Sequence, residues 1–196
     1  MILASNNAHK LEEFRAIFAD MGIEIIPQSA AGCHFEVDET GETFEENAYL
    51  KAIAVTRATG QPAVADDSGL MVDALGGAPG VHSARYAGEH ASDAENLDKL
   101  LDAVCGKTDR RARFVSVITA VFPDGRRITA RGECEGKILD ERRGSGSFGY
   151  DPVFYYEPLG KTFAEMTTEE KNAVSHRGKA VRRFAEMFFL DKPARE

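Results

Sequence analysis

Two adjacent carboxylates, Asp66 and Asp67, follow the apolar run 63–65 and precede the small residues Ser68 and Gly69. Carboxylate oxygens suit Mg²⁺, which keeps several of its waters and bridges to phosphate groups. The small residues that follow would let a ligand approach the backbone. An Asx-type turn carrying two solvated acids explains the same residues equally well. By itself the pair of carboxylates therefore fits a metal site and a turn equally well.

A polar run near the N-terminus could bind an anion. It consists of Ser5, Asn6, Asn7, Ala8, His9 and Lys10. Hydroxyl, amide and ammonium groups here gather at the start of a predicted helix, whose free N–H groups and dipole favour negative charge. A triphosphate cradle is one interpretation, and an ordinary Asn-rich helix cap is the commoner one.

A basic trio lies near the C-terminus of an otherwise acidic chain. Lys171, His176 and Arg177 fall in a region with a helical pattern. Arginine can bind phosphate or a carbonyl in a bidentate manner, and histidine can donate or accept a hydrogen bond. A solvated helix face would show the same composition.

Aromatic side chains flank a glycine in the segment Phe148, Gly149, Tyr150 and Asp151. It follows a flexible polar loop that begins at Gly144. The aromatic rings could stack on a nucleobase, or they could fill the core. The sequence favours neither alternative.

The elements that must position these residues alternate between strands and helices. Strands are predicted at 2–4, 23–26, 63–65, 70–72, 114–122, 127–136 and 152–156. Asp66 and Asp67 would then sit where a strand ends. The turn Pro123-Asp124-Gly125 predicts a hairpin with antiparallel strands.

Helical spacing occurs between the first two strands and ends at Gly22. Two further helices carry capping boxes, in which Thr43 pairs with Glu46 and Ser92 with Glu95. The chain beyond residue 156 is expected to be helical up to the tail at 191. Together these elements predict an α/β fold with a long mixed sheet and helices packed on it.

Composition fits one globular domain over residues 1–196. The formal charge of −8 disfavours a nucleic-acid polymer or an anionic membrane as a partner. Three cysteines with no C-x-x-C spacing suggest a reducing cytoplasm. No segment has the length and apolarity of a membrane span.

Taken together, these motifs resemble the inosine triphosphate pyrophosphatases of the Ham1, or RdgB, family. The resemblance extends over nearly the whole chain, and it is carried in order by residues 5–7, 40–48, 65–70, 76–80, 147–152 and 175–178. It implies an α/β fold of two lobes with the active site in the cleft between them. It also implies a homodimer. Arg85 and Tyr86, after the Gly-rich stretch, are candidates for a dimer contact or for packing of the substrate lobe.

The resemblance also assigns roles to residues. Asp67 matches the proton acceptor and a Mg²⁺ ligand, Asp66 supports it, and Glu39 matches a second metal ligand. Ser5 to Lys10, Ser68 and Lys171 would hold the triphosphate. Phe148 to Asp151, with His176 and Arg177, would close over the purine and read its 6-oxo group. The implied reaction is attack of water on the α-phosphorus of ITP, dITP or XTP, which releases pyrophosphate.

One position departs from the family pattern, because His9 stands where many relatives have glycine. A first helical turn would accept histidine, whereas a position with positive φ would strain it. Two other functions compete with the one implied. They are a Maf-like pyrophosphatase with a different base preference and a nucleotide sensor without catalysis.

Overall fold

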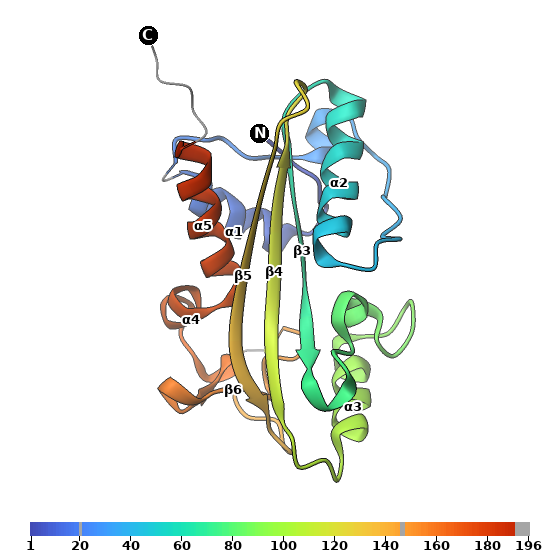
Figure 1. The fold of residues 1–196 in the computed structure, drawn as a ribbon, viewed down its shortest axis with the longest axis vertical. Coiled ribbons are helices and arrows are strands. Elements are labelled where there is room, and N and C mark those ends of the chain that lie inside the picture. Colours follow the sequence, from blue (N-terminus) through green and yellow to red (C-terminus); the bar gives the residue numbers. More distant parts are fainter. Residues whose placement is uncertain (20, 146–147, 191–196) are drawn as a thin grey trace. The chain divides into compact units, whose positions relative to one another are not determined.

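The computed structural model describes residues 1–19, 21–145 and 148–190, so Gly146 and Ser147 of the predicted polar loop lie outside the described residues. Within these ranges seven strands form one sheet in the order β2-β1-β3-β4-β5-β6-β7 (Figure 1). The strands are β1 (Ile2–Leu3), β2 (Ile26–Pro27), β3 (Ala63–Val72), β4 (Arg111–Val121), β5 (Arg127–Ile138), β6 (Phe154–Tyr156) and β7 (Lys161–Thr162). The helices are α1 (Ala8–Ala19), α2 (Phe44–Thr59), α3 (Asp93–Val104), α4 (Thr168–Val174) and α5 (His176–Leu190).

The sheet is mixed, as the sequence predicts. Strand β1 runs parallel to β2 and β3, whereas β6 is antiparallel to both β5 and β7. The hairpin is confirmed by its two ends. Phe122 N donates to Arg126 O at 3.0 Å beside the turn, and Ile138 N donates to Arg110 O at 2.9 Å at the far end. The predicted α/β fold with helices flanking a mixed sheet is therefore confirmed.

The chain divides into two compact units. The first comprises Met1–Asp67, Val117–Arg131 and the chain from Ala180 onward, and the second comprises Ser68–Ser116 and Gly132–Lys179. That residues 1–196 form a single domain stays a prediction. The placement of the active site in a cleft between two lobes also stays a prediction.

Helices cover both faces of the sheet in the first unit. Leu3 and Val64 pack in one cluster with apolar residues of α1 and α5. Ala63 and Ala65 pack in another cluster with residues of α2. Successive side chains of a strand point to opposite faces, so the alternation along β3 sends its residues to α1 and α5 or to α2 in turn. Figure 1 shows α2 on one side of these strands and α5 on the other.

The second unit has its own core. Leu70 and Val72 of β3 pack there with Leu97 and Leu100 of α3 and with Phe114 of β4. Both predicted capping boxes are present, so α2 and α3 begin where the sequence predicts. Local hydrogen-bonding groups therefore fix these helix starts.

The prediction that Asp66 and Asp67 end a strand is wrong. Residues 63–72 form a single ten-residue strand, and the two carboxylates lie in its middle. The Asx-turn alternative is thereby excluded. Buried acids are uncommon inside strands, so the sequence pattern suggests a break where the structure has none. The ion pairs described below are what make this burial tolerable.

Two other predictions of secondary structure are also wrong. The strand expected at 23–26 is reduced to Ile26–Pro27. The chain between β6 and α4 is not helical throughout, because it contains β7 and two short 3-10 helices, η4 (Glu157–Leu159) and η5 (Phe163–Glu165). Gly160 in the left-handed conformation turns the chain from η4 into β7.

Removal of the α2 cap should lower stability measurably. The Thr43 hydroxyl accepts a hydrogen bond from Glu46 N at 3.2 Å. Thr43→Ala is expected to reduce the free energy of unfolding by about 1 kcal/mol, because it leaves that N–H without its acceptor. Urea unfolding followed by circular dichroism measures the change. Thr43→Ser keeps the hydroxyl and should match the wild type, and an unchanged midpoint in Thr43→Ala would contradict the assigned cap.

Candidate active site

The two central carboxylates of β3 take different lysines. Asp66 pairs with Lys10 of α1 at 2.9 Å, and Asp67 pairs with Lys51 of α2 at 2.7 Å. This division follows from the alternation of the strand, which turns adjacent side chains toward opposite faces. Lys51 also pairs with Glu39 at 2.7 Å. The first unit therefore brings Glu39 and Asp67 together around one ammonium group.

Helix α2 fixes the acidic loop that carries Glu39. Asn47 is fully buried, and its side-chain oxygen accepts a hydrogen bond from Gly41 N at 2.8 Å. A Cβ atom on Gly41 would lie 2.6 Å from the Glu46 Cβ, so only glycine fits this approach. Asn47 and Lys51 are one helical turn apart and lie on the same face of α2. One face of one helix thus places both the loop and the lysine.

Burial and charge act against each other at this cluster. Burial raises the pKa of Asp67, and the ammonium of Lys51 offsets only part of that effect, so the net pKa is raised. Burial lowers the pKa of Lys51, but the carboxylates of Asp67, Glu39 and Asp66 together outweigh it and the net pKa is raised. Lys51 therefore remains charged, while Asp67 is more basic than an ordinary aspartate.

One oxygen of Asp67 is available for a ligand. The Oδ1 atom accepts from Lys51, whereas Oδ2 is buried without a hydrogen-bond partner among the described residues. A buried carboxylate oxygen without a partner is costly, and a cation or a water would satisfy it. No group of three or more His, Cys, Asp or Glu side chains is poised to hold a metal ion within the described ranges. Two carboxylates nevertheless fit Mg²⁺, which takes its other ligands from water and phosphate.

The polar run at the N-terminus caps α1. Asn7 N donates to Ser5 Oγ, and Lys10 N donates to the side-chain oxygen of Asn7, both at 3.1 Å. The helix-cap interpretation is therefore confirmed in geometry, and Asn6 is exposed beside it. A capped helix start still favours an anion through its N–H groups and dipole, so anion binding at this segment stays a prediction.

Ala8 and His9 form the first turn of α1, although their side chains lie outside the described part of the structure. A first helical turn is the alternative in which histidine is not strained. The departure at His9 thus leaves the backbone of this segment undisturbed.

The basic trio occupies the second unit. Lys171 pairs with Asp151 at 2.5 Å, and Arg177 donates to Ser68 Oγ at 3.2 Å. His176 is buried and stacks on Phe114, with ring centroids 4.8 Å apart. The solvated-face interpretation is therefore wrong for His176. The second unit thus contains two pairs of residues that the sequence singled out as substrate-binding, Lys171 with Asp151 and Arg177 with Ser68.

The two aromatic residues of the 148–151 segment differ in their surroundings. Phe148 is 56% exposed, so it does not fill the core. Tyr150 is 5% exposed and belongs to the core of the second unit. Gly149 has φ of +58° and forms the turn between them. The core-filling alternative is therefore confirmed for Tyr150, and stacking of Phe148 on a base stays a prediction.

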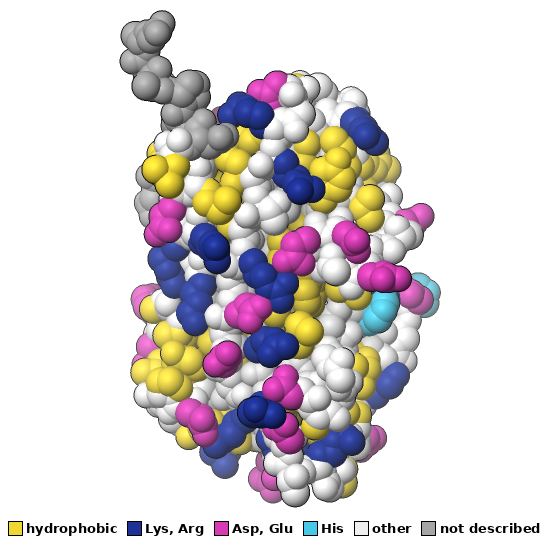
Figure 2. All heavy atoms as spheres, in the orientation of Figure 1, with side chains coloured by type: hydrophobic (Ala, Val, Ile, Leu, Met, Phe, Trp, Pro, Cys, Tyr) yellow, Lys and Arg dark blue, Asp and Glu magenta, His cyan; other side chains and the backbone are white. Residues whose placement is uncertain are grey.

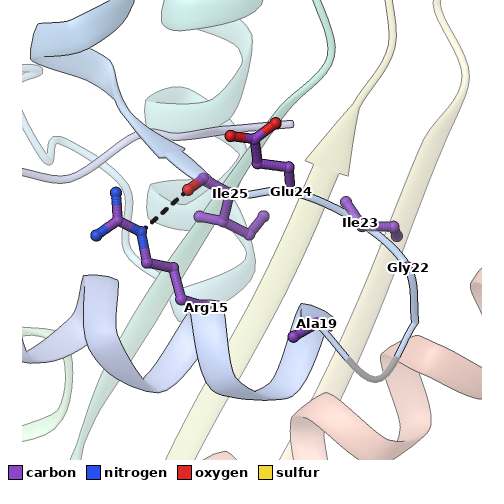
Figure 3. A pocket seen from close by; sticks show the side chains of 6 residues that line it. All are labelled: Arg15, Ala19, Gly22, Ile23, Glu24 and Ile25. Atoms are coloured by element: carbon purple, nitrogen blue, oxygen red, sulfur yellow. Dashed lines mark hydrogen bonds between the residues drawn. The ribbon is translucent and has the colours of Figure 1, made fainter.

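A separate pocket lies at the end of α1. It has a volume of about 430 Å³ and is lined by Arg15, Ala19, Gly22, Ile23, Glu24 and Ile25. Figure 3 shows the hydrogen bond that Arg15 Nε donates to Ile25 O at 3.2 Å. This lining contains none of the residues predicted to do chemistry.

Comparison with known proteins identifies the family. The model of the Ham1 family matches residues 1–187. The chain belongs to the Ham1 family. A dITP/XTP pyrophosphatase of Desulfotalea psychrophila is 54% identical over 181 residues, which cover 92% of this chain and 81% of that protein. A dITP/XTP pyrophosphatase of Clostridium perfringens is 48% identical over 188 residues, covering 92% of each chain.

A solved structure of the Staphylococcus aureus Ham1 protein has the same fold. It is 44% identical, superposes with a TM-score of 0.91, and covers 97% of this chain and 98% of its own. The family resemblance expected from the motifs is thus confirmed. The match spans both carboxylates of β3 and the trio at 171–177.

The sequence analysis did not single out two residues of this candidate site. Lys51 and Asn47 were not among the predicted functional residues, although both lie within the helix that Thr43 caps. Their spacing of one turn on a single helix face was the available signal. A lysine in a helix is usually solvated, so only the contacts with Glu39 and Asp67 reveal its position.

The raised pKa of Asp67 predicts a stability effect in the metal-free protein. An acid with a raised pKa in the folded state costs stability above that pKa, and the cost vanishes as pH falls to the ordinary value of 3.8. Asp67→Asn should therefore melt at a higher temperature than the wild type at neutral pH in EDTA. The difference should shrink as the pH is lowered toward 4.

Differential scanning fluorimetry across pH measures this difference. Asp73→Asn, at a more exposed carboxylate, is the matched control, and its melting temperature at neutral pH should not exceed that of the wild type. A lower melting temperature for Asp67→Asn at neutral pH would contradict a net cost of the Asp67 charge.

Proposed function

We propose that this chain hydrolyses non-canonical purine nucleoside triphosphates, namely ITP, dITP and XTP, to the monophosphate and pyrophosphate. The observation that carries the proposal is the buried Oδ2 atom of Asp67, which has no partner in the described structure and lies beside Glu39 and Lys51 in a Ham1 family chain. The curated relatives are named for this activity toward dITP and XTP. This Asp67 oxygen and the names of the relatives together favour an enzyme over a nucleotide sensor.

Asp67 is the proposed general base. Its raised pKa and its available oxygen suit it to orient a water and take its proton. Glu39 and Asp67 would hold Mg²⁺, which would supply positive charge against the triphosphate. Lys51 holds the Oδ1 atom of Asp67, so that Oδ2 keeps one orientation. Attack of the water on the α-phosphorus then releases pyrophosphate.

The phosphates are proposed to bind basic and helix-start groups. Ser5 to Lys10 offer the capped start of α1, and Ser68 and Lys171 add a hydroxyl and an ammonium. Lys10 pairs with Asp66, and Lys171 pairs with Asp151. These ion pairs hold both ammonium groups in place before substrate binds. Pre-placed cations lower the ordering cost of binding a polyanion.

Base recognition is assigned to residues 148–151 with His176 and Arg177. A donor facing the 6-oxo group of hypoxanthine or xanthine would be left unpaired against the 6-amino group of adenine. Phe148 is 56% exposed, and we propose that its ring stacks on the base.

The remaining partners are proposed from charge and family. On the face drawn in Figure 2, basic and acidic side chains are interspersed and form no large patch of one sign, which disfavours a nucleic-acid polymer. No helix in the described ranges is long and apolar enough to cross a membrane. A homodimer and a cytoplasmic location are proposed from the family and from the free cysteines Cys33, Cys105 and Cys134.

A substrate panel tests the function. ITP, XTP, dITP, ATP, GTP and TTP are incubated with Mg²⁺, and pyrophosphate and orthophosphate are scored separately. Pyrophosphate from the first three is the expected result. Orthophosphate as the first product would overturn attack at the α-phosphorus. A preference for TTP would favour a Maf-like enzyme, and binding without hydrolysis would favour a sensor.

A further inference from the structure

A buried serine lies behind the Gly-rich segment 76–80, to which the proposed function assigns no role. Ser83 belongs to the 3-10 helix η3 (Gly80–Arg85) and is 7% exposed. Its hydroxyl accepts from Leu70 N at 2.8 Å and donates to Gly80 O at 2.6 Å. The hydroxyl thus uses both its donor and its acceptor to fix η3 to β3.

The backbone carbonyl of the same residue holds the segment 148–151. Tyr150 donates its hydroxyl to Ser83 O at 2.7 Å, and this bond is buried. Burial raises the pKa of the Tyr150 phenol well above its usual range, so the group stays a donor. A buried hydroxyl that has its acceptor fixes the position of its ring.

The hydrogen bonds of Ser83 connect Leu70 to Tyr150. Both of these residues lie close in sequence to residues proposed to bind substrate. Leu70 follows Ser68 by two residues in β3, and Ser68 Oγ accepts from Arg177. Tyr150 precedes Asp151, which binds Lys171. A second tie, from Gly149 N to Asp93 Oδ2 at 2.9 Å, is exposed to water and therefore weaker.

We propose that Ser83 and Tyr150 are positioning residues that hold the base-recognition segment in register with Ser68 and thereby set the preference for 6-oxo purines. This inference rests on the proposed function. It requires no contact between Ser83 and substrate. The hydroxyl of Tyr150 likewise acts through the backbone of Gly149 and Asp151.

The main test is Tyr150→Phe, which deletes one hydrogen bond and keeps the ring in the core. The KM for dITP should rise about fivefold, the typical effect of one lost buried hydrogen bond, while kcat stays within about twofold. The ratio of kcat/KM for dITP over dATP should fall by about the same factor. Ser83→Ala should change KM and this ratio in the same direction.

A matched control separates positioning from stability. Thr56→Val removes a buried hydroxyl-to-carbonyl bond in the first unit, from Thr56 to Val121 O at 3.2 Å. It should lower the melting temperature as Tyr150→Phe does, but leave KM and the base ratio unchanged. The proposal would be overturned if Tyr150→Phe or Ser83→Ala kept both the wild-type KM and the wild-type ratio of kcat/KM for dITP over dATP.

The double variant Ser83→Ala/Tyr150→Phe adds a second criterion. If both hydroxyls act through one connection, the effects on KM should be less than additive. Full additivity would mean that the two residues act separately and would overturn the connection. Failure of the proposed function is distinguishable, because it appears in the wild type as absence of hydrolysis. In that event the ratio of Kd values for dITP and dATP, measured by calorimetry, decides the positioning claim.

Discussion

Asp67→Asn should abolish turnover of dITP while the fold is retained. The substitution keeps the size of the side chain but removes the proton acceptor and one of the two proposed metal ligands. Loss of a general base typically costs about 10²–10⁴ in rate, and loss of a ligand adds to it. We expect kcat/KM to fall by at least about 10³, measured as pyrophosphate release at saturating Mg²⁺.

The neighbouring carboxylate provides the control for this variant. Asp66→Asn makes the same chemical change one residue away, on the face of β3 that pairs with Lys10. It should reduce kcat/KM by about tenfold or less, since Asp66 has a supporting role, pairs with Lys10 and takes no proton. Equal losses in both variants would contradict the division of roles between the two carboxylates. Circular dichroism should show that both variants are folded.

Lys51→Met is the second variant with a large expected effect. Lys51 has a side chain only 13% exposed and holds both Glu39 and Asp67. Without its charge the two carboxylates repel one another in a buried setting, so the pKa of Asp67 rises further and less of it is ionised at neutral pH. We expect kcat to fall by about 10² at pH 7, with partial recovery at higher pH.

A pH profile of kcat is the measurement for Lys51→Met. The acidic limb of the profile should move to higher pH than in the wild type, because a group that titrates higher is ionised later. Lys161→Met is the matched control, since it breaks a more exposed pair with Glu170 at 2.7 Å. That variant should retain wild-type activity. An unchanged profile in Lys51→Met would exclude an electrostatic role for Lys51.

Local patterns in the sequence predict much of the fold. The helix starts at Thr43 and Ser92 are found because a capping box involves residues three apart. The hairpin between β4 and β5 is found because proline and glycine in its turn restrict or permit particular backbone angles. Strand β3 is predicted in two pieces, because two acids in a buried strand are costly unless distant lysines pair with them.

The α/β class and the Ham1 resemblance could be predicted from the sequence, and a catalytic role for Asp67 is what that resemblance implies. Each depends on residue types in local order along the chain. The tertiary structure was needed to show that Asp66 and Asp67 take different lysines. It also shows that Lys51 pairs with Glu39 and that Asn47 binds Gly41. The bond between Tyr150 and Ser83 O likewise appears only there. These pairings join residues 12 to 67 positions apart, except for Asn47 and Gly41 at six. The physical reason is that burial and charge pairing depend on which elements pack together, and no local spacing specifies that packing.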